Sequence, residues 1–137
     1  MGVENIEFGE NIESVRSKLP GEFETFYRIL YPEDLKDPYP SDHFVDIGIF
    51  CYYNAGGNLE AMEFSEPARP ILSGVDILNI PFRQAEALFE KLDADLVRDL
   101  GSVISERWSL AIMKPGRRSD PTEMFLAGRA GLYKDKP

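Results

Sequence analysis

Apolar residues recur at helical spacing in two parts of the chain. Ile12, Val15 and Leu19 are spaced three and then four residues apart, so they would share one face of a helix. Asn11 precedes them as a typical N-cap, and Pro20-Gly21 would end the helix. The second pattern follows Pro81, which suits a first helical position, and it consists of Phe82, Ala85, Leu88, Phe89 and Leu92.

The strongest strand pattern lies in the middle of the sequence. Residues 43–53 are dense in β-branched and aromatic side chains, residues 54–58 have the composition of a turn, and residues 59–65 return to an apolar alternation. We therefore predict a β-hairpin whose first strand is central and covered on at least one side. Shorter strands are predicted at residues 5–8, 75–80, 102–104, 108–113 and 122–127.

Three other segments have weaker patterns. Phe23, Phe26, Tyr27, Leu30 and Tyr31 would fall on one face of a further helix. Residues 32–42 contain three prolines and are predicted to be a loop, and residues 93–100 are predicted to add a short helical piece.

These elements indicate an α+β domain that spans residues 1–137. The order of short strand, helix, loop and hairpin occurs twice, which suggests half-repeats at residues 1–66 and 67–134. If the repeat is real, the hairpins of both halves would form one antiparallel sheet with the helices packed on one face. The alternative is that the similarity of the halves arose by chance.

The net charge of −9 is unevenly distributed. Residues 1–66 contain 14 acidic and 4 basic side chains, a charge of −10, whereas residues 67–137 contain 10 acidic and 11 basic side chains, a charge of +1. The negative electrostatic potential of the first half opposes nucleic-acid binding and attracts basic proteins. The alternative is that the net charge only keeps the domain soluble. The first residues do not read as a secretory signal and the chain has no apolar run of about 18 residues, so we expect a cytoplasmic protein without membrane contact.

The sequence offers little catalytic chemistry. Cys51 and His43 are the single residues of their types, and along one extended strand they would lie too far apart to pair. One cysteine and one histidine also do not make a zinc site, so we expect no metal, no cofactor and no catalytic residues. The alternative is a small enzyme or ligand-binding domain that uses Asp46, Glu60 and Glu63 in a pocket between sheet and helices.

The sequence resembles a group of small bacterial domains. The segments that carry the resemblance are Ile6-Glu7-Phe8-Gly9, Val15-Arg16, Gly48-Ile49-Phe50-Cys51-Tyr52-Tyr53 and Leu59-Glu60-Ala61-Met62-Glu63-Phe64. Similar doubled helix-plus-sheet units occur in the β-lactamase inhibitor protein. The resemblance implies a fold used for protein binding, and small acidic domains of this kind also resemble immunity proteins that neutralise bacterial toxins.

The best candidate for a binding segment is the acidic, proline-rich stretch at residues 31–42, because tyrosine anchors with flanking charges suit protein interfaces. An ordinary connector is the alternative. Its candidate partner-binding residues are Tyr31, Glu33, Asp34, Asp37, Tyr39 and Asp42. We thus expect an acidic, non-catalytic protein-binding module, most concretely an immunity-type inhibitor of a basic toxin or enzyme. The sequence leaves the partner's identity and the oligomeric state open.

Overall fold

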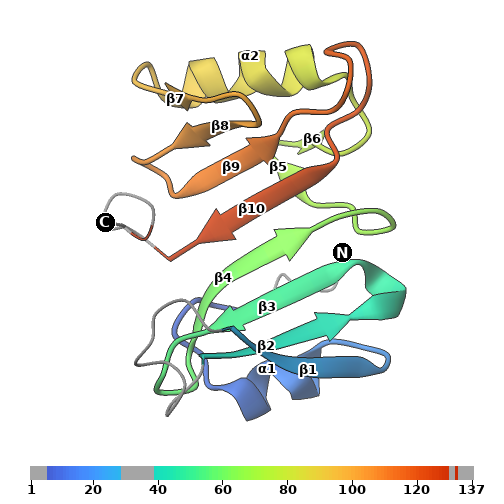
Figure 1. Ribbon diagram of the computed structural model, residues 1–137, viewed down its shortest axis with the longest axis vertical. Coiled ribbons are helices and arrows are strands. Elements are labelled where there is room, and N and C mark those ends of the chain that lie inside the picture. The colour runs from blue at the N-terminus through green and yellow to red at the C-terminus, as the bar shows by residue number, and fades with distance from the viewer. Residues whose placement is uncertain (1–5, 29–38, 130–131, 133–137) are drawn as a thin grey trace.

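The chain folds into one large antiparallel sheet accompanied by helices (Figure 1). The computed structural model describes residues 6–28, 39–129 and 132. Its α-helices are α1 (Ile12–Lys18) and α2 (Phe82–Leu92), and a 3₁₀ turn covers Val45–Ile47. The strands are β1 (Phe23–Arg28), β2 (Tyr39–Phe44), β3 (Ile49–Tyr53), β4 (Leu59–Phe64), β5 (Ile71–Leu72), β6 (Val75–Asp76), β7 (Val97–Arg98), β8 (Ser102–Ser105), β9 (Leu110–Met113) and β10 (Met124–Gly128).

Eight strands form the large sheet, in the order β1-β2-β3-β4-β10-β9-β8-β7, while β5 and β6 pair separately. Each half of the chain therefore contributes a helix followed by four strands, and the halves meet where β4 pairs with β10. Both halves share this order of elements. The short strand expected at residues 5–8 is not formed by the described residues 6–8, and Gly9 turns the chain at φ +99°.

Both predicted helices are confirmed. The side chain of Asn11 accepts a hydrogen bond from the Ser14 amide at 2.8 Å and so caps α1, as its position in the sequence predicts. Helix α2 begins directly after Pro81, and its buried apolar residues are Phe82, Ala85 and Phe89. The periodicity of the apolar positions was sufficient for both, because each helix packs one face on the sheet.

The pairing register shows that both helices pack on the same face of the sheet. Arg16 of α1 binds Asp42 of β2, and Asp93, which ends α2, accepts a hydrogen bond from Ser105 of β8. Directly opposite residues of an antiparallel pair point to the same face. The register connects these two contacts through one cross-strand row, which runs Asp42, Cys51, Met62, Ala127, Leu110 and Ser105.

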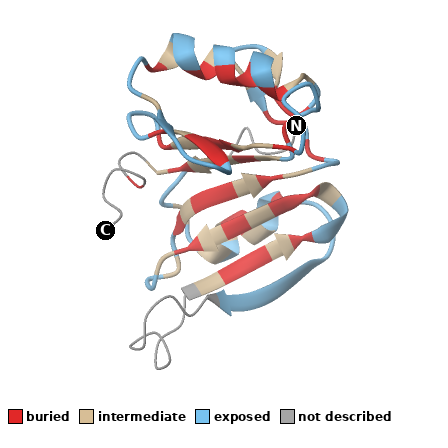
Figure 2. Ribbon diagram, turned by 45° about the horizontal axis from the view of Figure 1, so that its top comes forward, coloured by how far each residue is buried: buried red, intermediate tan, exposed pale blue. Residues whose placement is uncertain are grey.

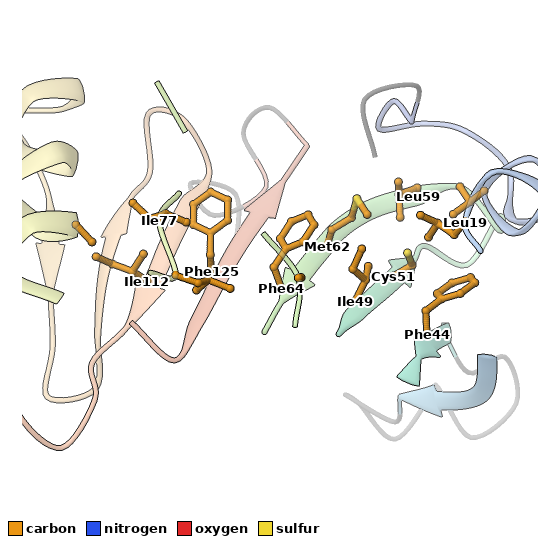
Figure 3. Close-up of a cluster of buried hydrophobic side chains, with 14 of the residues drawn as sticks. Leu19, Phe44, Ile49, Cys51, Leu59, Met62, Phe64, Ile77, Ile112 and Phe125 are labelled. Atoms are coloured by element: carbon orange, nitrogen blue, oxygen red, sulfur yellow. The ribbon is translucent and has the colours of Figure 1, made fainter. Parts of the chain in front are cut away.

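The hydrophobic core lies between the helices and this face. Figure 3 shows its side chains in a continuous layer that crosses from one half of the sheet to the other. Phe64 of β4 and Phe125 of β10 meet in the middle with ring centroids 5.9 Å apart, and Phe89 of α2 contacts Phe125 edge-on. The two halves therefore share one core.

The predicted hairpin is confirmed as β3 and β4, but its first strand begins later than expected. Residues 43–53 are two strands joined by the 3₁₀ turn, and Gly48 reverses the chain at φ +69°. A Cβ atom at Gly48 would lie 2.2 Å from the carbonyl oxygen of Ser65. The turn therefore requires glycine for its backbone angle and for the close approach of a neighbouring segment.

The prediction of a helix from Phe23 onward is wrong, because residues 23–28 form strand β1. The aromatic spacing suits a helix, but six residue pairs with β2 decide the structure. Residues 39–42, expected in a loop, belong to β2, where Pro40 is tolerated.

Two shorter predictions also need correction. The strand predicted at residues 75–80 is only Val75–Asp76, and the buried Ile77 and Leu78 enter the core from a turn. The helical piece predicted at residues 93–100 is instead a turn and the edge strand β7.

Candidate binding surface

The acidic segment predicted to bind a partner lies mostly outside the described residues. This holds for Tyr31, Glu33, Asp34 and Asp37. Tyr39 begins β2, where its backbone is paired with that of Arg28.

Asp42 belongs to the interior and not to the surface. Its carboxylate is 0 % exposed and accepts hydrogen bonds from Arg16 Nε at 2.8 Å and Nη2 at 2.9 Å, from Thr25 Oγ1 at 2.8 Å and from Tyr53 OH at 3.2 Å. The hydrogen bonds to Asp42 raise the pKa of Arg16, so Arg16 stays a cation. Asp42 therefore fixes α1 to the sheet, and we leave it out of any partner surface.

The three carboxylates of the alternative hypothesis do not share a pocket. Asp46 is exposed in the 3₁₀ turn before β3. Glu60 and Glu63 are near opposite ends of β4, about 10 Å apart along an extended strand. In the described part of the chain, no group of three or more His, Cys, Asp or Glu side chains could hold a metal ion.

A cavity of about 620 Å³ lies beyond the paired ends of β4 and β10. Its walls come from the segments after β4 and before β10, and its charged lining residues are Glu66, Arg69, Asp120 and Glu123. None of Asp46, Glu60 and Glu63 lines it. The side chain of Arg69 forms an ion pair with Asp76, with 3.2 Å between Nη1 and Oδ2.

His43 and Cys51 come closer than the sequence suggests but still do not form a pair. The chain folds back between them, so that His43 pairs with Phe50, the neighbour of Cys51. Adjacent strand residues point to opposite faces, and Cys51 accordingly faces the core while His43 faces away from it. Burial raises the pKa of the Cys51 thiol to about 12, as is typical of an inert core cysteine.

A second set of side chains points to the sheet face opposite the helices. The buried hydrophobic cluster includes none of its side chains. Figure 2 shows buried and half-buried positions alternating along the central strands, and residues 23–27 of β1 are exposed. We call this surface the open face, and the side chains that the register assigns to it include Glu24, Phe26, Ser41, His43, Phe50, Tyr52, Ala61, Glu63, Val97, Ser102, Ile104, Ala111, Met113, Met124 and Leu126.

Aromatic side chains gather on the open face over β1, β2 and β3. The rings of His43 and Phe50 are stacked, with centroids 3.9 Å apart and planes 8° from parallel. Phe26 meets Phe50 edge-on at 6.0 Å, and Tyr52 lies parallel to Phe50 at 6.1 Å. Phe26, His43, Phe50 and Tyr52 are the aromatic cluster, and sequence reasoning missed it because it took Phe26 for a helical residue and residues 43–53 for one strand.

Glu63 stands beside the aromatic cluster in apolar surroundings. It is directly opposite Phe50 on one side and Leu126 on the other. Tyr52 OH donates a hydrogen bond to its Oε1 at 3.1 Å. Burial raises the pKa of Glu63, and the Tyr52 hydrogen bond and the charge of His43 oppose this only in part.

Comparison with protein-family models, with curated proteins and with solved structures found no match for this chain. No described helix is both long enough and apolar enough to cross a membrane.

Proposed function

We propose that this chain is a non-catalytic, acidic protein-binding module that docks a basic protein on the open face. The observation that carries the proposal is the aromatic cluster, because helices cover the other face of the sheet while these rings stay partly accessible. Aromatic residues are enriched among the anchors that dominate protein interfaces.

Charge supports a basic partner over a second copy of the chain. Residues 1–66 carry the charge of −10 and supply Glu24 and Glu63 to the open face. Two copies that met through this face would bring like charges together, whereas a basic protein would be attracted at long range. Immunity-type inhibition of a basic toxin is the biological use that fits this chemistry best.

The proposal is tested by co-expression with the product of the gene immediately upstream. We expect that product to be basic, to arrest growth when expressed alone, and to be neutralised when this chain is present. A harmless neighbour, or a toxic one that the chain does not neutralise, would contradict the proposal.

Three acidic residues of the sequence segment before β2, Glu33, Asp34 and Asp37, remain proposed contributors to association. Reversal of Glu33, Asp34 and Asp37 to lysine should slow association with the basic partner at low salt by about tenfold or more. The matched control reverses three exposed carboxylates of the second half to lysine, namely Asp95, Glu106 and Glu123, and changes the net charge equally. Equal on-rates for the two triple variants would remove the segment from the interface.

A further inference from the structure

Glu63 forms no ion pair with a described lysine or arginine. Its neighbours across the strands are the apolar side chains of Phe50 and Leu126. Its Oε1 is occupied by Tyr52, and its Oε2 accepts no hydrogen bond from a described residue. A partly desolvated carboxylate is costly in the free protein unless a charge compensates it.

The aromatic rings beside Glu63 have the geometry of a receptor for a planar cation. His43 covers one face of the Phe50 ring, and Phe50 lies directly opposite Glu63 of β4. A guanidinium group can stack on an aromatic face and at the same time bind a carboxylate, which an ammonium group does less well. At the far end of the same cross-strand row, Glu24 adds a second negative charge opposite His43.

We propose that Glu63 and Phe50 form an anchor site for an arginine side chain of the partner. The guanidinium would stack on the face of the Phe50 ring that His43 does not cover and donate a hydrogen bond to Oε2 of Glu63, while Tyr52 keeps the carboxylate in position through Oε1. This inference rests on the proposed function, since it supplies the point at which a basic partner would be anchored.

The chain's buried carboxylates are held in two ways. Asp93, at the end of α2, accepts hydrogen bonds from Ser105 and from the backbone amide of Asp95. Asp42 and Glu86 have cations beside them, because Asp42 is held by Arg16 and Glu86 of α2 is held by Arg98 and Arg118. Glu63 on the open face lacks such a partner among the described residues.

The probe is N-acetyl-arginine amide, titrated into isotopically labelled protein and followed by NMR, with the uncharged isostere N-acetyl-citrulline amide as its control. We expect saturable shifts centred on Phe50, Glu63 and Leu126 with a dissociation constant in the millimolar range for the arginine probe, and none for the citrulline probe. Glu63→Gln should weaken binding at least about fivefold, whereas Glu123→Gln, at an exposed carboxylate, should leave it unchanged.

Absence of shifts on the open face, equal shifts with the citrulline probe, or unchanged binding in Glu63→Gln would overturn the anchor site. A dispersed NMR spectrum of Glu63→Gln confirms that the variant is folded. Neutralisation of a basic toxin together with a failed probe titration would refute the anchor site alone, so the two proposals fail separately.

Discussion

Replacement of Asp42 by asparagine tests the ion pair that fastens α1 to the sheet. Both oxygens of this carboxylate act as acceptors, and each accepts two hydrogen bonds. In either orientation, the amide of asparagine would point its own donors at two of these donor groups. Removal of one partner from a buried ion pair costs about 3–5 kcal/mol. Because the Arg16 side chain is 23 % exposed and can turn toward water, we expect the lower end, about 3 kcal/mol.

The assay is urea unfolding at pH 7, with Glu13→Gln as the matched control. Glu13 lies 3.7 Å from the same Arg16, but its side chain is 82 % exposed, so its loss should cost about 0.5 kcal/mol or less. A domain of this size is stable by roughly 5–15 kcal/mol, and Asp42→Asn should therefore remain folded. A loss below about 1 kcal/mol for Asp42→Asn, or equal losses for the two variants, would refute this account of how α1 is held.

Three further predictions concern stability and reactivity. The pKa of Glu63 is raised in the folded protein, so protonated Glu63 adds to the stability below the ordinary pKa of 4.5, and this gain is lost as the pH rises through the folded pKa. Glu63→Gln should therefore unfold at a higher temperature than the natural chain at pH 7. The difference between the two melting temperatures should vanish on acidification. A thermal melting series over pH shows this, and a destabilised Glu63→Gln at pH 7 would contradict it. Cys51 should resist a thiol reagent at neutral pH until the protein unfolds, since its pKa is about 12, and fast labelling of the native protein would refute its burial. Gly57→Ala should cost about 1 kcal/mol for its positive φ alone, and Gly48→Ala clearly more, because its methyl group would meet the backbone of Ser65; similar unfolding midpoints would argue against that close approach.

Local patterns in the sequence were sufficient wherever one segment decides its own structure. The N-cap at Asn11, the face of α2 and the glycine turn after Tyr53 depend on neighbouring residues, and all were predicted correctly. Strand β1 could not be predicted from its own residues, because its structure depends on pairing with β2. The two strands are separated in the sequence by residues 29–38, which lie outside the described structure. The aromatic spacing at Phe23 and Phe26 is compatible with both structures, and only the partner strand decides between them.

The candidate site was harder to predict than the fold for the same reason. The open face brings together residues from β1, β2, β3 and β4, and its composition follows from the register of the sheet, which the sequence does not display. Asp42 was assigned to an acidic surface by its neighbours in the sequence, but Arg16, 26 residues away, draws it into the interior. Glu63 was named among the candidate residues for a pocket, and the structure gives it a different setting, beside aromatic rings on the open face.

The central claim is that a basic partner binds on the open face, and side-chain footprinting by hydroxyl radicals tests it most directly. The toxin neutralised by co-expression would be purified in complex with this chain, and oxidation would be compared with that of the chain alone. We predict protection of Phe26, Tyr52 and Met113 on the open face, with no change at Trp108, which is half exposed and donates a hydrogen bond to Leu92 at the end of α2. Protection of Trp108, with the open-face residues oxidised as in the free chain, would contradict the claim.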